Sequence, residues 1–222
     1  MISSHSNNIS AIFFDVGGTL LDTPELIPRV HQVLIDFGFD ISESCLRQRH
    51  KILSELILFP DRTDEQFYYH FNSEFLLSLG VEPTEALLTK MLQSCSKMDW
   101  QPFSDVWPVL MKLDLPLGIC SNWNTGLNKL LEQQFDKSFN WIICSENEGV
   151  RKPNLNFFKL MTERSGVRAE NILYVGDSYK LDYLPAKKLG FQTILIDRVN
   201  IYSFEHEERI RSMTNLNRFI RP

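Results

Sequence analysis

The sequence predicts an α/β fold built on a parallel β-sheet, and three observations support this prediction. Short, almost wholly apolar runs alternate with amphipathic helical segments from about residue 100 to the C-terminus. Such strands are typical of a parallel sheet that helices cover on both faces. A similar apolar run near the N-terminus needs strand partners, so it must join the same sheet. The residues between it and the later strands, about 24–98, have only helical periodicity, which predicts a helical insertion after the first strand.

The first predicted strand is SAIFFD, at residues 10–15, an apolar run that ends in a carboxylate. Four helical segments follow it. The third begins with Thr63 and Gln66, which have the spacing of a capping box. It also carries an aromatic stripe, Phe67, Phe71 and Phe75. At this helical spacing we expect the stripe to lie inside a helical bundle rather than to form a binding face.

The second half of the chain supplies the rest of the predicted sheet. The strands are LPLGIC, WIIC, NILYVGD and QTILID. The helices are DVWPVLMKL, residues 126–135, NLNFFKLMTERSG and YKLDYLPAKKLG, and we expect a closing helix after Asp197. Together these elements predict a Rossmann-like parallel-sheet core of residues 1–22 and 100–222, into which an α-helical cap of residues 23–99 is inserted.

Composition excludes several classes of function. The 222 residues are 43% hydrophobic and 23% charged, and the formal net charge is -5. Without an overall basic field, broad nucleic-acid binding is not expected. The four cysteines form no CxxC and the histidines have no ligand spacing, so a zinc site is not expected either. No signal-peptide pattern and no apolar run of about 20 residues is present, so we expect a cytoplasmic protein with no membrane partner. The sequence does not indicate an oligomeric state.

Polar residues follow the predicted strands at the ends where ligands bind. In an open parallel sheet, ligands bind outside the carboxyl ends of the strands. Each of these residues alone has an ordinary explanation as a helix cap or a turn residue. Together they place acids, a lysine and a hydroxyl at one sheet edge, which turn chemistry does not require. The set is Asp15, Ser121, Asn122, Lys152, Asp177, Ser178 and Asp182.

This set of side chains suits phosphoryl transfer. A carboxylate that approaches a phosphate dianion meets a repulsion of roughly 4 kcal/mol per charge pair at about 4 Å and an effective dielectric constant near 20. A divalent cation reverses the sign of this interaction. Asp15 and Asp177 supply the hard oxygen ligands that Mg²⁺ prefers. Lys152 adds a positive charge and Ser121 can donate to phosphate oxygens, so Asp15 could form an aspartyl-phosphate that water later hydrolyses.

Four motifs in this order, FFDVGGTLLD, ICSN, RKP and VGDSYKLD, resemble those of the haloacid dehalogenase superfamily of hydrolases. The resemblance covers the whole chain, since the helical insertion is similar to the smaller cap of that family. It implies that Asp15 is the nucleophile and that Ser121 binds phosphate. It also implies that Lys152 stabilises nucleophile and phosphate, and that Asp177 coordinates Mg²⁺.

The resemblance implies supporting roles as well. The carbonyl of Gly17 would be a further metal ligand, and Ser178 and Asp182 would support the metal ligands. Substrate contacts are expected from Gly18, Thr19, Asn122 and Trp123, of which Trp123 directly follows the phosphate-binding turn. For the cap cations Arg47 and Arg49 and for His50, we expect a solvated helix face rather than substrate contact.

One position departs from the family pattern. Phosphatases of this family usually carry a second Asp two residues after the nucleophile, as general acid and base, whereas this chain has Gly17. Such catalysis contributes about 10²–10⁴-fold in rate, or roughly 3–5 kcal/mol of barrier. We therefore expect a Mg²⁺-dependent phosphohydrolase that acts on a small phosphorylated metabolite. Either its acid comes from elsewhere, such as the cap or a water, or it favours leaving groups that need little protonation, as in acyl and aryl phosphates.

Three further interpretations remain open at this stage. A metal-independent 2-haloacid dehalogenase also begins with an Asp nucleophile and commonly lacks the second Asp, although the acids of VGDSYKLD argue against it. A phosphonate hydrolase has a small residue at the Gly17 position and needs a cap lysine, for which Lys51 is a candidate. Alternatively, the protein is a weakly active phospho-ligand-binding or interaction protein, which the intact Asp15, Lys152 and Asp177 argue against.

Overall fold

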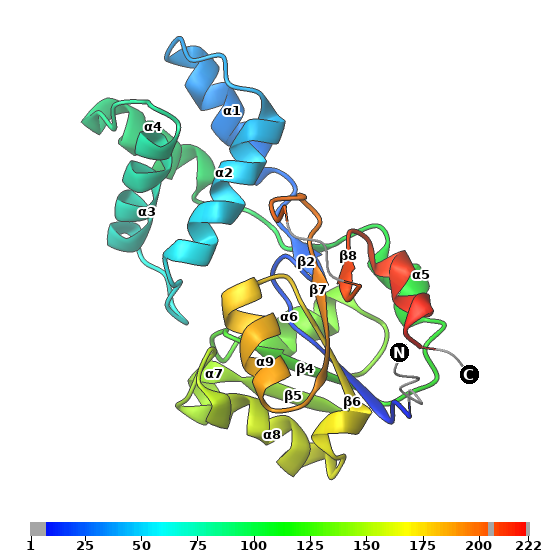
Figure 1. Ribbon diagram of the computed structural model, residues 1–222. Coiled ribbons are helices and arrows are strands. Elements are labelled where there is room, and N and C mark those ends of the chain that lie inside the picture. Colours follow the sequence, from blue (N-terminus) through cyan, green and yellow to red (C-terminus); the bar gives the residue numbers. More distant parts are fainter. Residues whose placement is uncertain (1–7, 204–206, 221–222) are drawn as a thin grey trace. The chain divides into compact units, whose positions relative to one another are not determined.

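The computed structural model describes residues 8–203 and 207–220 (Figure 1). This part of the chain divides into two compact units. An α/β unit contains residues 8–21, 102–198 and 207–220, and a helical unit contains residues 22–101 together with 199–203. None of the helices in the described ranges is both long enough and apolar enough to cross a membrane.

The α/β unit contains a six-stranded sheet in which each neighbouring pair is parallel. The strand order is β5–β4–β1–β6–β7–β8. The strands are β1 (Ala11–Phe14), β4 (Leu117–Ser121), β5 (Trp141–Cys144), β6 (Ile172–Gly176), β7 (Gln192–Ile196) and β8 (Arg209–Ile210). This sheet confirms the predicted α/β fold class. The chain adds β4 and β5 on one side of β1 and then β6, β7 and β8 on the other, so a topological switch point lies between β1 and β6.

Both faces of the central strands are covered, which explains their unbroken apolar runs. All residues of β1, β4 and β6 are buried. On one face, Phe13 of β1 packs in a cluster with Phe157 and Phe158 of α8 (Leu155–Ser165) and Ala186 of α9 (Leu184–Lys188). Helices α8 and α9 are neighbours on this face (Figure 1). The unit also contains α5 (Val106–Leu110), α6 (Leu127–Gln134), α7 (Ser145–Glu148) and the 3₁₀ turn η1 (Ala169–Asn171).

The segment after β7 differs from the prediction. In place of a closing helix, the described residues form the short strand β8 and the 3₁₀ helix η3 (Met213–Arg218). Tertiary contacts override the local preference here, because β8 pairs with β7 and the Asp105 carboxylate accepts hydrogen bonds from Ser212 Oγ and Met213 N. Two other short strands, β2 (Leu21–Asp22) and β3 (Gln101–Pro102), pair with each other. Neither is long enough to show a sequence periodicity.

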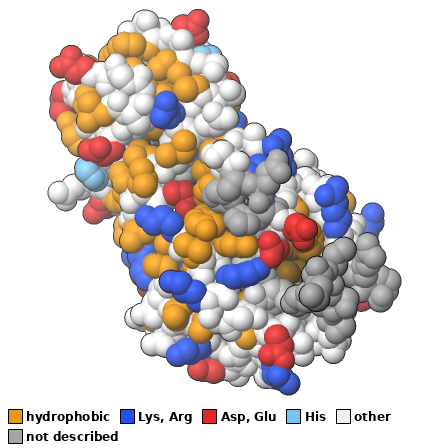
Figure 2. Space-filling view, in the orientation of Figure 1, with side chains coloured by type: hydrophobic (Ala, Val, Ile, Leu, Met, Phe, Trp, Pro, Cys, Tyr) orange, Lys and Arg blue, Asp and Glu red, His pale blue; other side chains and the backbone are white. Residues whose placement is uncertain are grey.

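The helical unit consists of α1 (Leu26–Asp36), α2 (Glu43–Leu56), α3 (Glu65–Ser78) and α4 (Glu85–Cys95). Its core includes Phe71 and Phe75, with Phe67 packed against it, so the predicted role of the aromatic stripe is confirmed. The capping box at Thr63 is not formed. Asp64 caps α3 instead, because its carboxylate accepts a hydrogen bond from Phe67 N at 2.7 Å. Side chains of both charge signs occur on the face drawn in Figure 2.

Candidate active site

Asp15 follows β1 directly and is 6% exposed. Its backbone N–H donates to Val175 O at 2.9 Å, which extends the pairing of β1 with β6 by one residue. Its carboxylate oxygen Oδ1 accepts two hydrogen bonds, from Lys152 Nζ at 2.6 Å and from Ser121 Oγ at 2.8 Å. No donor to Oδ2 is found among the described residues. The side chain is therefore fixed through one oxygen, while the other is available for chemistry.

Lys152 is 3% exposed and uses all three of its N–H donors. Nζ donates to Asp15 Oδ1 and Asp182 Oδ1, each at 2.6 Å, and to the Tyr174 hydroxyl at 3.2 Å. Burial by itself would lower the pKa of Lys152, but the carboxylates of Asp15 and Asp182 raise that pKa above its ordinary value. The ammonium group therefore stays charged at neutral pH and is held on three sides.

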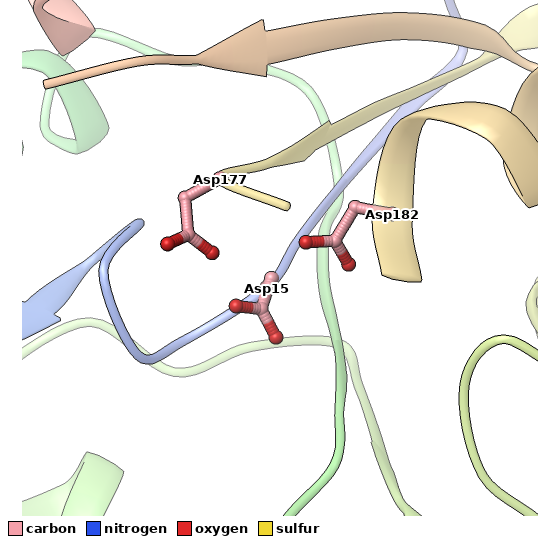
Figure 3. A group of neighbouring side chains, drawn as sticks. All are labelled: Asp15, Asp177 and Asp182. Carbon is pink, nitrogen blue, oxygen red and sulfur yellow. The ribbon is translucent and has the colours of Figure 1, made fainter. Parts of the chain in front are cut away.

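Three carboxyl groups lie close together at this edge of the sheet (Figure 3). Asp15 follows β1, Asp177 follows β6, and Asp182 belongs to the π-helix η2 (Tyr179–Tyr183), and their oxygens lie within 4.8 Å of one another. Burial raises the pKa of Asp15, while Lys152 opposes this shift. Three carboxylates and one ammonium group carry a formal charge of −2, which a divalent cation would neutralise. Carboxylate oxygens are ligands that suit Mg²⁺, so this donor set fits such an ion.

Two glycines make room for these acids. Gly18 has a φ of +74°, and a Cβ atom there would lie 2.2 Å from Asp177 Oδ2. A Cβ atom on Gly176 would lie 2.4 Å from Cγ of Asp182. Any larger residue at either position would displace a carboxylate. The VGDSYKLD motif contains Gly176, but the sequence assigns it no role, because a glycine at a strand end also has an ordinary explanation as a turn residue.

The loop after β1 has further internal contacts. Gly17 forms a bridge with Leu21, and Gly18 N donates to Leu21 O at 2.8 Å. Thr19 is fully buried, and its carbonyl accepts a hydrogen bond from Arg198 Nη2 at 2.8 Å. The Thr19 hydroxyl has no hydrogen-bond partner among the described residues. This loop is therefore held by backbone contacts rather than by its side chains.

The loop after β4 connects to Lys152. Asn122 Nδ2 donates to Lys152 O at 3.1 Å, and Lys152 N donates to Asn122 Oδ1 at 2.8 Å. Trp123 is half-buried, and its backbone N–H donates to Ser145 Oγ at 3.0 Å. Asn122 was expected to contact substrate, but its side chain is bonded to the backbone of Lys152.

The comparisons with known proteins identify the family. A family model described as a haloacid dehalogenase-like hydrolase matches residues 9–190, most of the chain. The chain belongs to the haloacid dehalogenase-like hydrolases. The sequence resemblance is therefore confirmed.

Some relatives of this hydrolase are named as phosphatases and others as dehalogenases. It is 27% identical over 212 residues to a glyceraldehyde 3-phosphate phosphatase of Methanocaldococcus jannaschii, with 90% of each chain covered. It is 29% identical over 208 residues to an (S)-2-haloacid dehalogenase of Pseudomonas putida, which covers 87% of this chain and 86% of that one. Among solved structures, an L-2-haloacid dehalogenase from Xanthobacter autotrophicus has a TM-score of 0.62 at 23% identity and covers 95% of this chain and 97% of that one. This last likeness concerns the fold alone.

One side chain at the centre of the hydrolase site was not anticipated. The Tyr174 hydroxyl lies 2.7 Å from Asp182 Oδ1, 3.2 Å from Lys152 Nζ and 3.1 Å from Cys120 O. Burial first, and then the charge of Asp182, raises the pKa of Tyr174 well above its ordinary value, so the phenol is neutral. Tyr174 lies inside the apolar run of β6, which predicts a strand but no site residue at this position. The only sequence feature that indicates a role for Tyr174 in the site is its hydroxyl group, which is unusual in an otherwise apolar strand.

The remaining predicted residues lie next to η2 and on α2. Ser178 caps η2, since its Oγ accepts from Leu181 N at 2.9 Å, and its N–H donates to Asp182 Oδ2 at 3.0 Å. Lys51 belongs to α2 in the helical unit, where it pairs with Glu55 at 3.0 Å. Ser178 thus holds Asp182 through its backbone N–H. Arg47, Arg49 and His50 also belong to α2. The expected solvated face is wrong for His50, because its ring packs edge-on against the buried Phe71 and Phe75.

Proposed function

We propose that this hydrolase is a Mg²⁺-dependent phosphohydrolase that acts on a small phosphorylated metabolite through an aspartyl-phosphate on Asp15. The observation that carries the proposal is the cluster of Asp15, Asp177 and Asp182, in which the buried Lys152 pairs with Asp15 and Asp182. Its charge of −2 calls for a divalent cation, and its position beside the β1–β6 switch point is where ligands bind in this fold. Relatives named glyceraldehyde 3-phosphate phosphatase support a small phosphorylated substrate.

In the proposed reaction, Oδ2 of Asp15 attacks phosphorus while Lys152 and Ser121 hold Oδ1. A bond forms between Oδ2 and phosphorus, and the bond from phosphorus to the leaving-group oxygen breaks with its electron pair on that oxygen. Water then attacks the acyl phosphate, which releases inorganic phosphate and restores the carboxylate. Lys152 keeps its positive charge throughout and lowers the repulsion between Asp15 and the phosphate.

Mg²⁺ would be held by Asp15, Asp177 and the carbonyl of Gly17. When bound, it neutralises negative charge on the phosphate oxygens. Gly18 supports this assignment, because the missing Cβ atom allows the loop backbone to approach Asp177. The helical unit would act as the cap that selects the substrate, with Trp123 as the substrate contact contributed by the α/β unit.

Gly17 has no proton to give to a leaving group. We expect the wild type to hydrolyse acetyl phosphate and p-nitrophenyl phosphate at least about 100-fold faster than glyceraldehyde 3-phosphate, which reflects the missing general acid. Gly17→Asp should raise the rate with glyceraldehyde 3-phosphate by about 10–100-fold and leave that with acetyl phosphate within about threefold. The measurement is phosphate release under steady-state conditions with Mg²⁺. Rapid wild-type hydrolysis of the alkyl phosphate that Gly17→Asp leaves unchanged contradicts this leaving-group preference.

A 2-haloacid dehalogenase is the second candidate, favoured by Gly17 and by relatives with that name. That chemistry needs an Asp nucleophile but no metal, so it gives no reason for Asp177 or for the space that Gly18 leaves beside it. Chloride release from (S)-2-chloropropionate separates the two candidates. Release that persists in the presence of a chelator supports the dehalogenase and contradicts the phosphohydrolase.

A further inference from the structure

We propose that Asn122 is a positioning residue, which sets the place of the Lys152 ammonium group by holding the backbone of Lys152. This inference rests on the proposed function and assigns Asn122 a role different from substrate contact. The Asn122 side chain accepts a hydrogen bond from Lys152 N at 2.8 Å and donates one to Lys152 O at 3.1 Å. Thirty residues separate the two in sequence, so the contact joins two loops that no strand pairing connects.

The backbone of Lys152 depends on this contact. Lys152 precedes α8 and belongs to neither a helix nor a strand, so its amide and carbonyl have no partners in regular structure. Buried backbone groups must be paired, and a primary amide can both accept from an N–H and donate to a carbonyl. Asn122 satisfies both groups of one residue at once. The carboxylate of an aspartate could replace the acceptor but not the donor.

The other end of the Lys152 side chain is fixed as well. Its ammonium group makes contacts of 2.6 Å to Asp15 and to Asp182 and lies 3.2 Å from the Tyr174 hydroxyl. The side chain therefore spans a fixed distance between Asn122 at its base and these groups at its tip. A shift of the backbone moves the ammonium group relative to Asp15, and a displacement of about 1 Å can cost roughly 10²-fold in rate.

The opposite end of the same strand offers a matched control. Asn122 follows the C-terminal end of β4, whereas Asn140 holds the N-terminal end of that strand. Asn140 Oδ1 accepts from Leu117 N at 3.0 Å, and Asn140 N donates to Leu117 O at 2.7 Å. Asn140→Ala therefore removes a side-chain hydrogen bond to the backbone of the same strand, at the end away from the site.

The experiment compares wild type, Asn122→Ala, Asn122→Asp and Asn140→Ala. We expect both Asn122 variants to lower kcat by about 10–100-fold with acetyl phosphate and Mg²⁺, while KM stays within about threefold. Amide hydrogen exchange at Lys152, measured by mass spectrometry or NMR, should become faster in Asn122→Ala. Asn140→Ala should lower the Tm but leave kcat and the exchange at Lys152 unchanged.

Two results would overturn the inference. One is a rise in KM with kcat and the Lys152 exchange unchanged, which would mean that Asn122 contacts substrate. The other is an equal loss of kcat in Asn140→Ala, which would mean that any weakening of β4 has the same effect. A wild type that hydrolyses no phosphate substrate contradicts the proposed function instead, and exchange at Lys152 then still decides whether Asn122 holds this backbone.

Discussion

Asp15 presents one carboxyl oxygen for chemistry because Lys152 and Ser121 hold the other. The two donors come from separate parts of the fold, since Ser121 ends β4 and Lys152 lies between α7 and α8. The position of Asp177 depends on a missing side chain, because its carboxylate occupies the space that a Cβ atom on Gly18 would fill. At the scale of single residues, an absent side chain matters as much as the charged groups.

Gly18→Ala should therefore abolish most of the activity. The added Cβ atom would lie 2.2 Å from Asp177 Oδ2, so that carboxylate must move, and we expect a loss of about 100-fold or more in Mg²⁺-dependent phosphate release. Gly190→Ala is the control, because Gly190 also has a positive φ, +84°, but a Cβ atom there meets nothing within 4 Å.

Both variants should lose about 1–2 kcal/mol of stability from backbone strain, measured by urea unfolding. Only Gly18→Ala should lose activity. Equal activity in the two variants would show that Asp177 does not need the space beside Gly18.

Residues at strand ends could be predicted from the sequence, whereas residues that act from within strands could not. Asp15, Ser121 and Asp177 follow apolar runs, and the topology of a parallel sheet brings such positions together. Tyr174 lies inside such a run, and its contact with Lys152 depends on the pairing register of β6 with β1. The pairing register is set only when the strands come together in the folded sheet, so the sequence pattern of β6 alone does not predict this contact.

At the scale of elements, the apolar strands and the long helices were predictable because their patterns repeat over many residues. The short strand β8 and the helix η3 were not, because pairing with β7 and the hydrogen bonds of Asp105 determine them. The residue that caps the start of α3 was also not predictable from the sequence alone. Thr63 and Asp64 are both good caps, and only the folded geometry selects Asp64.

Packing between α2 and α3 predicts a pH dependence of stability. His50 on α2 lies edge-on to Phe71 and Phe75 of α3, with ring centroids 5.2 and 5.9 Å away. Burial, together with Lys51 and Arg47, lowers the pKa of His50 to about 4. The unfolded chain has the ordinary value near 6.5 and so binds more protons between about pH 4 and 6.5. The free energy of unfolding should therefore fall as the pH decreases through this range.

We expect His50 to contribute about 1–3 kcal/mol to this fall, which urea unfolding at pH 7.5 and pH 4.5 measures. His50→Gln should reduce the difference between the two pH values by that amount. His70→Gln, at an exposed position on α3, should leave the difference unchanged. Identical pH dependence in wild type and His50→Gln would show that His50 titrates normally.

At the scale of the whole molecule, Arg198 joins segments that are far apart in the sequence. Its guanidinium group donates to both carboxylate oxygens of Asp105 at 2.9 and 3.0 Å and to Thr19 O at 2.8 Å. It also lies 3.8 Å from the ring centroid of Phe103. Asp105 in turn accepts from Ser212 at 2.6 Å. The C-terminal segment and the loop after β1 are therefore connected through one ion pair.

Arg198→Met should lower the free energy of unfolding by about 1–3 kcal/mol, because it removes hydrogen bonds to a charged, largely buried partner. Arg164→Met is the control, since Arg164 is 53% exposed in its pair with Glu148 and should contribute less than about 1 kcal/mol. Chemical unfolding measures both. Equal effects of the two substitutions would mean that the Arg198 pair is no more than a surface contact.

The central claim is that Asp15 performs phosphoryl transfer with the help of a divalent cation. The most direct test measures phosphate release from acetyl phosphate by wild type and Asp15→Asn, each with Mg²⁺ and with EDTA, alongside chloride release from (S)-2-chloropropionate. We predict phosphate release that requires both Mg²⁺ and Asp15, and no release of chloride. Chloride release that persists in EDTA, without any phosphate release, would contradict this prediction.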